Sequence, residues 1–109
     1  MVRGVPVLND ATIDDARQIG LTDTVEVVGN GSTIAGTCLE DLSKEALEVV
    51  QNADVIISKG QGNFESLYGE GVNPYYMFLC KCELFVSRFG LERFKSVFMR
   101  EERFGNRIY

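Results

Sequence analysis

The stretch SKGQGN combines residue types that bind phosphate. Lys59 follows an apolar run, ADVII, so its ammonium group has little freedom to move away from the end of the predicted strand. Gly60 and Gly62 let the backbone approach a ligand closely, and the N-terminus of the helix expected next adds partial positive charge. Lys59 would then neutralise a phosphate as a point charge. A solvated turn without any ligand explains the same residues.

Asn63 completes this stretch and has two candidate roles. It either caps the following helix or reaches the ligand, and capping is the simpler role.

Two further polar loops each follow a predicted strand. In NDAT, Asp10 is a hard oxygen ligand for Mg²⁺ or Mn²⁺, and equally an ordinary residue at the start of a helix. In GNGST, Asn30, Gly31 and Ser32 offer backbone and side-chain donors to a phosphate, although Asn-Gly is also a common plain turn. Neither a P-loop nor a GxGxxG pattern is matched.

The elements that position these loops alternate between strands and helices. Strands are expected at 5–10, 24–28 and 54–58, and helices at 12–20, 42–53 and 62–69. Thr12 and Asp15 form a weak capping box for the first helix, and Ser43 or Asp41 caps the second. Residues 73–90 begin as a strand and turn helical before Gly90, whereas residues 91–104 fit a helix or a strand with a tail.

Strands that are nearly all apolar and alternate with helices predict an α/β fold with a mostly parallel sheet covered on both faces. In such sheets, ligands bind beyond the carboxyl ends of the strands. The three polar loops should therefore meet at one edge. Together, a carboxylate for a metal, a glycine loop and a lysine near a helix start predict a metal-assisted phosphoester site.

Composition narrows the classes of function. A chain of 109 residues suits one domain over residues 1–109. Residues 1–91 hold thirteen acids and six bases, net −7, which argues against a nucleic-acid surface. Residues 92–109 hold three acids and five bases, and we interpret this basic tail as a solvated helix face or terminus.

Absent residue types narrow the chemistry further. The sequence has no histidine, which excludes histidine-based triads and histidine metal ligands. Three cysteines without a disulfide-like spacing favour a reducing cytoplasm, and Cys80 and Cys82 are expected to be buried small apolar residues rather than a metal site. No apolar run reaches the length of a membrane span, and no signal peptide is visible.

Four segments carry a family resemblance: VRGVPVLNDATIDDARQIGL, VGNGSTIAGT, ADVIISKGQGNFESL and YYMFLCKC. Their order and spacing resemble those of the damage-control metal-dependent phosphatases, also catalogued as domain of unknown function 89. The resemblance covers roughly residues 2–88, and NDAT and SKGQGNFE are its most specific motifs.

The resemblance implies a three-layer α/β/α, Rossmann-like phosphatase domain that hydrolyses small phosphorylated metabolites with Mn²⁺, Co²⁺, Ni²⁺ or Mg²⁺. It implies that Asp10 is a metal ligand and that Lys59 binds phosphate, so both would be catalytic. The GNGST loop, with Asn30, Gly31 and Ser32, would contact the substrate. Gly60 and Asn63 would complete the phosphate site.

One motif of the family is missing. Members carry an Asp-Asn-x-Gly-Glu motif about forty residues before NDAT, which supplies the other protein metal ligands, and no equivalent occurs in this sequence. We therefore expect an incomplete domain, corresponding to the C-terminal part of a family member, with low or no activity alone. An exposed sheet edge would be covered by the C-terminal tail, by self-association or by a missing N-terminal portion.

Three hypotheses remain. The chain is an incomplete metal-dependent phosphatase, a non-catalytic module that binds phosphate or a nucleotide through Lys59 and the glycine loops, or a structural remnant that binds nothing.

Overall fold

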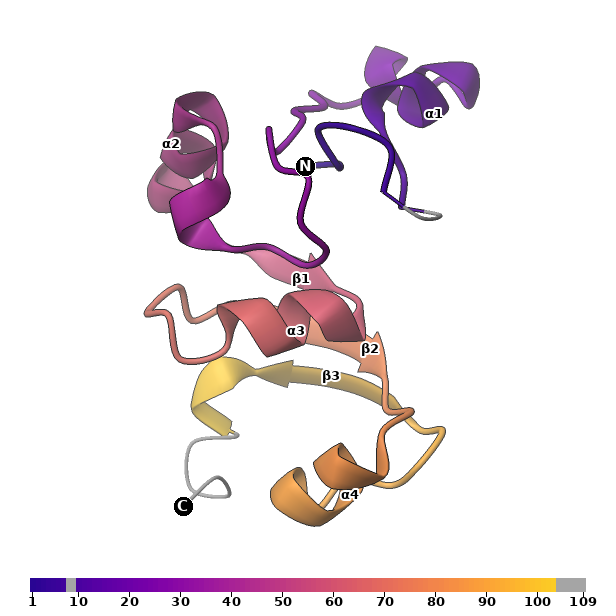
Figure 1. Ribbon diagram of the computed structural model, residues 1–109, viewed down its shortest axis with the longest axis vertical. Helices are drawn as coiled ribbons and strands as arrows, with labels where there is room; N and C mark the ends of the chain where they lie inside the picture. The colour runs from indigo at the N-terminus through magenta and orange to yellow at the C-terminus, as the bar shows by residue number, and fades with distance from the viewer. Residues whose placement is uncertain (8–9, 104–109) are drawn as a thin grey trace. The chain divides into compact units, whose positions relative to one another are not determined.

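The computed structural model describes residues 1–7 and 10–103 (Figure 1). The chain divides into two compact units, Met1–Asn52 and Ala53–Tyr109. Candidate site residues occur in both: the NDAT and GNGST loops belong to the first unit, and SKGQGN belongs to the second.

The first unit holds two α-helices and two short 3₁₀ turns. These are α1 (Ile13–Gln18), η1 (Leu21–Asp23), η2 (Leu39–Asp41) and α2 (Lys44–Asn52). Both helices lie where the sequence predicts them. The predicted capping box is present, since the Asp15 carboxylate accepts a hydrogen bond from the Thr12 backbone N–H at 2.8 Å. For α2, Ser43 is the cap, because its hydroxyl oxygen accepts from the Ala46 N–H at 3.2 Å.

The strands predicted at 5–10 and 24–28 are wrong for the described residues. None of the described residues in these two ranges forms a strand or a bridge, and the parallel bridges nearby are isolated ones, Val2 with Gly29 and Arg3 with Thr12. Val5 and Val25 are 41% and 49% exposed, so neither lies in a buried strand. Residues 8 and 9 of the first predicted strand lie outside the described residues.

The second unit contains a three-stranded sheet and two α-helices. In chain order they are β1 (Ile57–Lys59), α3 (Gln61–Leu67), β2 (Tyr75–Leu79), α4 (Glu83–Phe89), β3 (Ser96–Arg100) and the 3₁₀ turn η3 (Glu101–Arg103). The sheet order is β1-β2-β3, with β1 and β2 parallel and β2 and β3 antiparallel. The α/β class predicted from the sequence is confirmed, and the sheet is mixed. The region 91–104, which the sequence leaves undecided, supplies β3.

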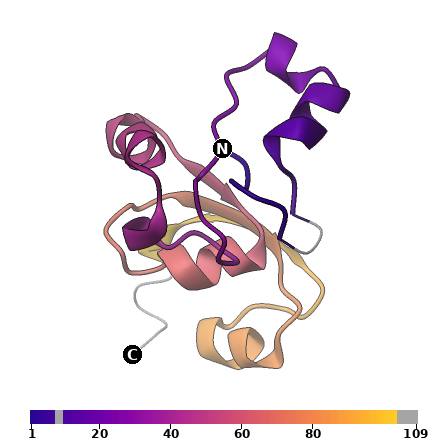
Figure 2. The ribbon, with the colours of Figure 1, turned by 45° about the horizontal axis from the view of Figure 1, so that its top comes forward.

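Helix α3 lies in front of β1 and β2 in Figure 1, and the rotated view in Figure 2 shows it against the same strands. Phe64 of α3 is 1% exposed and is the centre of an aromatic cluster. Its ring lies 4.7 Å from that of Tyr76, 4.9 Å from that of Phe78, and 5.3 Å from those of Phe85 and Phe89. This apolar packing holds α3 and α4 against one face of the sheet.

Helix α4 ends as predicted at Gly90, which adopts a left-handed conformation with φ of 64°. The Glu101 carboxylate of η3 accepts hydrogen bonds from the Tyr76 hydroxyl at 3.0 Å and from the Gly69 N–H at 2.8 Å. Burial, followed by this contact with Glu101, raises the pKa of Tyr76.

Cys80 is buried as expected, while Cys82 at the start of α4 is half-buried and Cys38 is exposed. All three thiols are free. Among the described residues, no helix combines the length and apolar character that crossing a membrane requires.

Candidate functional site

Arg3 joins the first two polar loops within the first unit. Its guanidinium is buried, and its Nε and Nη2 donate to Oδ2 of Asp10 at 3.3 and 3.2 Å. Its Nη1 donates to the carbonyl oxygen of Ile34, which follows the GNGST loop. Asp10 of NDAT and the residue that follows GNGST are therefore joined by Arg3, a cation that was not among the predicted site residues.

This arrangement bears directly on the predicted metal site. One oxygen of Asp10 is occupied by Arg3, which leaves Oδ1 as the oxygen that could reach a divalent cation. Mg²⁺ and Mn²⁺ require about six oxygen ligands, and a neighbouring guanidinium opposes a second cation. Across residues 1–7 and 10–103, no three acidic or cysteine side chains cluster as a metal site would need. The described donor set alone therefore does not fit the metal that the family resemblance implies.

Asn30 fixes the shape of the glycine loop. Its side chain is buried, and Oδ1 accepts from the backbone N–H groups of Gly4 at 2.8 Å and Ser32 at 2.9 Å. Its own N–H donates to Val2, and its carbonyl oxygen accepts from Ser43. Because Oδ1 is held twice, the amide has one orientation, and Nδ2 is the group left to donate to a ligand.

Glycine is required where this loop meets the N-terminal segment. A Cβ on Gly4 would lie 2.5 Å from the backbone nitrogen of Gly31. Gly31 has φ of 72°, and a Cβ there would lie 2.7 Å from Cβ of Ser43. The two backbones therefore approach more closely than any side chain permits.

Ser32 is also committed to contacts within the first unit. Its buried hydroxyl donates to the Asp41 carboxylate and accepts from the Ile34 N–H at 3.1 Å. Asp41 was predicted only as an alternative cap of α2, and that role is wrong because Ser43 fills it. A contact between Ser32 and a phosphate stays a prediction.

Lys59 is the last residue of β1, and its side chain is exposed. Gly60 follows with φ of 92° and ψ of 148°, a combination that only glycine adopts readily. Its N–H donates to the Met77 carbonyl at 2.8 Å, which continues the ladder between β1 and β2 by one residue. A Cβ on Gly60 would meet no atom within 4 Å, so the space beside this turn is open.

Asn63 does not cap α3, because Gly60 occupies the N-cap position. Asn63 lies in the first turn, where its Nδ2 donates to the Lys59 carbonyl at 2.6 Å. This bond closes the turn that carries the lysine.

The site residues thus form one defined group in each unit. In the first unit, Asp10 and the Asn30–Ser32 loop are tied together through Arg3 and its neighbours. In the second, Lys59, Gly60 and Asn63 form one turn. The meeting of all three loops at one edge stays a prediction. Arg3 and Asp41 were missed, although an arginine inside the otherwise apolar MVRGVPV segment was the available signal.

Residues 1–97 match the family described as damage-control phosphatase ARMT1-like domain. An uncharacterized protein of Methanocaldococcus jannaschii is 36% identical over 104 residues, which are 92% of this chain and 34% of that protein. A damage-control phosphatase of Pyrococcus horikoshii is 47% identical over 62 residues, 57% of this chain and 22% of that protein. One of Archaeoglobus fulgidus is 35% identical over 86 residues, 76% of this chain and 30% of that protein.

The fold gives the same result. A crystal structure of a DUF89 family protein from Pyrococcus horikoshii superposes with a TM-score of 0.85 and 34% identity, over 92% of this chain and 35% of that one. The chain spans about a third or less of the length of these relatives. With the family match extending over most of its residues, the chain belongs to the damage-control phosphatase ARMT1-like domain family.

Proposed function

We propose that the chain provides the phosphate-binding part of a damage-control phosphatase that hydrolyses small phosphorylated metabolites. The observation that carries the proposal is the turn after β1, where an exposed lysine and an open glycine follow a parallel strand in a chain of this family. Lys59 would neutralise phosphate charge as it develops during hydrolysis. Gly60 would let the ligand approach the backbone.

The first unit would contribute Asn30, whose amide is oriented by the two hydrogen bonds that Oδ1 accepts, so that Nδ2 is the group that would donate to the phosphate. Gly31 would allow a close approach of the backbone, and Ser32 would keep the loop in shape through Asp41. Asp10 would serve as a metal ligand only through Oδ1, and the remaining ligands of Mn²⁺, Co²⁺, Ni²⁺ or Mg²⁺ would come from outside the described residues. For this reason we propose that the domain is incomplete and weakly active or inactive alone, in a reducing cytoplasm.

The test is phosphate binding followed by turnover. Isothermal titration with inorganic phosphate should give weak saturable binding that falls at least tenfold in Lys59→Ala, because one charge-assisted contact is lost. Lys81→Ala is the matched control, since Lys81 is another exposed lysine of the same unit. Equal phosphate affinity in both variants would contradict the proposal.

Turnover of a generic phosphoester with Mn²⁺ then separates hydrolysis from binding. The chain alone should show little or no turnover, whereas the chain mixed with the unmatched part of a family member should show it. Turnover could be absent both for the chain alone and for the chain mixed with the unmatched part. If phosphate binding is nevertheless lost in Lys59→Ala, the phosphate-binding function is supported and the hydrolytic function is contradicted.

The Arg3–Asp10 pair favours a second candidate, a non-catalytic module that binds phosphate or a nucleotide. The Asp10 carboxylate already pairs with a buried guanidinium, so it should bind a divalent cation weakly. Phosphate would then raise the melting temperature equally with and without Mn²⁺. A requirement for Mn²⁺ would favour the phosphatase instead.

A further inference from the structure

Two lysines of the second unit lie at the same edge of its sheet. Strands β1 and β2 are parallel, so their carboxyl ends are adjacent. Lys59 is the last residue of β1, and Lys81 comes two residues after Leu79, the last residue of β2. In α/β sheets, ligands bind beyond the carboxyl ends of parallel strands. The proposed phosphate turn therefore has a second cation beside it.

Gln61 links the two segments that carry these lysines. It is the first residue of α3, and its Oε1 accepts a hydrogen bond from the backbone N–H of Lys81 at 3.3 Å. Its Nε2 donates to the Glu65 carboxylate at 3.1 Å, which fixes the orientation of the amide. The place of Lys81 next to the turn of Lys59 is therefore set by contacts within one unit.

The spacing of the two lysines suits two anionic groups. Met77 is the partner of Lys59 in the strand register, and Lys81 follows Met77 along the same extended segment. Extended backbone advances about 3.3 Å per residue, which places the α-carbons of Lys59 and Lys81 on the order of 13 Å apart. One phosphate would reach both ammonium groups only if the two side chains extended straight toward each other, which costs side-chain entropy and brings like charges together. A molecule with two separated anionic groups fits better.

Neither lysine is neutralised within the part of the chain that the structure describes. Both residues are exposed, and no carboxylate of that part lies within ion-pair distance of either ammonium group. Glu83, the acidic residue nearest to Lys81 in the sequence, pairs with Arg93 at 3.5 Å instead. Both ammonium groups are thus available to bind an anion.

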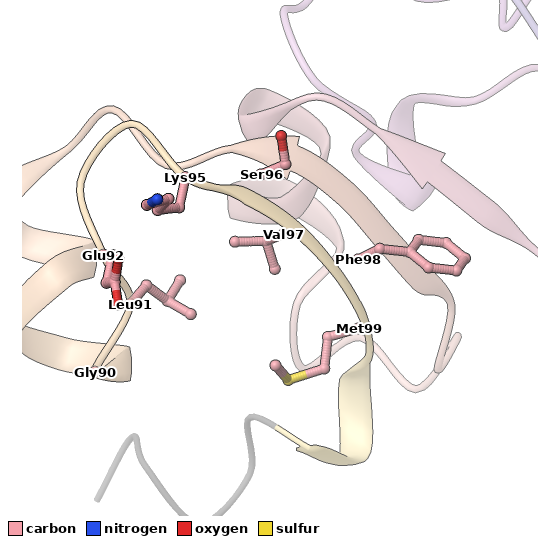
Figure 3. Close-up of a pocket in the computed structure, with 8 residues that line it drawn as sticks. All are labelled: Gly90, Leu91, Glu92, Lys95, Ser96, Val97, Phe98 and Met99. Atoms are coloured by element: carbon pink, nitrogen blue, oxygen red, sulfur yellow. The ribbon is translucent and has the colours of Figure 1, made fainter.

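A third lysine at this edge has a different setting. Lys95 precedes β3, and its carbonyl oxygen accepts a hydrogen bond from the Cys80 N–H at 3.0 Å. Lys95 and Glu92 both line a hollow of about 440 Å³ beside β3 (Figure 3). The carboxylate of Glu92 opposes an anion in that hollow, so Lys59 and Lys81 remain the pair suited to bind one molecule.

We propose that the substrate carries two anionic groups: a phosphoester bound at Lys59, and a second phosphate or a carboxylate bound at Lys81. Lys81 is then the residue that determines specificity, because a molecule with a single phosphate gains nothing from it. This assignment rests on the phosphate-binding function proposed for Lys59. It narrows the small phosphorylated metabolites to those with a second anionic group at a distance from the first.

The test is isothermal titration of the chain, without metal, with three compounds built on one six-carbon chain. They are hexane-1,6-diol monophosphate, the corresponding bisphosphate, and 6-phosphooxyhexanoate, in which a carboxylate replaces the second phosphate. The bisphosphate should bind at least tenfold more tightly than the monophosphate, because a second charge-assisted contact is gained. Equally tight binding of the carboxylate would show that Lys81 accepts either anion, whereas binding at the level of the monophosphate would assign Lys81 to phosphate.

Substitutions of Lys81 show whether it is the second contact. In Lys81→Ala the bisphosphate should bind within twofold of the monophosphate, whereas Lys81→Arg keeps the charge and should keep most of the preference. Inorganic phosphate has no second group and should bind Lys81→Ala as it binds the original chain, which also shows that the variant is folded. Arg100→Ala is the control and should retain the preference, because Arg100 is an exposed cation at the opposite edge of the sheet, paired in register with Tyr75.

Equal affinities of the original chain for the bisphosphate and the monophosphate overturn the proposal, as does an equal loss of preference in Lys81→Ala and Arg100→Ala. Binding of inorganic phosphate that depends on Lys59 would then show that the phosphate turn itself still stands. If no phosphate compound binds the chain, the proposed function and the role of Lys81 are both overturned.

Discussion

The two units of the chain are stabilised by different interactions. All four tyrosines and seven phenylalanines occur after residue 53, so the second unit has every aromatic side chain and the first has none. Among the described residues of the first unit, the buried apolar ones are the small or medium-sized Ala16, Val28 and Ala46. In the first unit, hydrogen bonds of the Arg3 and Asn30 side chains fix the conformation of the loops instead. The two candidate loops of the first unit are therefore fixed by polar contacts, whereas the SKGQGN turn of the second unit is supported by an apolar core.

The largest expected effect tests the aromatic core. Phe64→Ala should lower the free energy of unfolding by about 4 kcal/mol, because it removes a fully buried ring and leaves a cavity. Urea unfolding followed by far-ultraviolet circular dichroism measures it. Phe94→Ala is the control, since Phe94 is 63% exposed and should cost far less. A similar loss of unfolding free energy in both variants would show that Phe64 is not the centre of the aromatic cluster.

The next effect tests close backbone packing in the first unit. Gly4→Ala should cost about 2 kcal/mol, because the added Cβ would lie 2.5 and 2.7 Å from backbone atoms of Gly31 that must then move. Gly29→Ala is the matched control, because its Cβ would lie 3.5 Å from the nearest atom, Cα of Gly4. Equal melting temperatures for the two variants would show that the backbone of Gly31 can move away from the added Cβ without loss of stability.

A smaller effect is expected at the Arg3–Asp10 pair. Asp10→Asn should cost about 1.5 kcal/mol, because it removes the charge paired with a buried guanidinium. Hydrogen exchange should accelerate at the amides of Arg3 and Asn30, which donate to Ala11 and Val2. Asp14→Asn breaks the exposed pair with Arg17 and should cost less than about 0.5 kcal/mol.

The smallest effect concerns Tyr76. Tyr76→Phe should cost about 1 kcal/mol through loss of the hydrogen bond to Glu101. Because burial raises the folded-state pKa, the stabilisation from Tyr76 is complete below about pH 10 and is lost as the pH rises further, where the unfolded tyrosine ionises. The difference between the two proteins should therefore shrink above that pH. If the difference in the free energy of unfolding between the original chain and Tyr76→Phe stays constant from pH 8 to 11, the raised pKa of Tyr76 is contradicted.

Sequence patterns succeeded where the information was local. Helices α1, α2, α3 and α4 follow from caps, apolar spacing and terminal glycines, and β1 and β2 follow from short apolar runs. The α/β class followed from their alternation. The segments 5–10 and 24–28 look equally strand-like, yet none of their described residues pairs with another strand. Strand formation depends on distant pairing, which composition does not encode.

The candidate site divides in the same way. The place of Lys59 at a strand end, followed by a glycine in an unusual conformation, was predictable from SKGQGN. The roles of Arg3 and Asp41 were not, because their partners lie 7 and 9 residues away and depend on loop geometry. The amphipathic sequence of residues 91–104 fits a helix as well as a strand. Its hydrogen bonding to β2 makes part of it the strand β3.

The one-sided distribution of aromatic residues affects how the molecule is observed. The chain has no tryptophan, and its tyrosines all belong to the second unit, so intrinsic fluorescence reports on that unit alone. The loops around Asn30 have no fluorophore of their own unit to report their loosening. A single tryptophan at Ile19, which is 77% exposed at the end of α1, would give the first unit its own optical reporter.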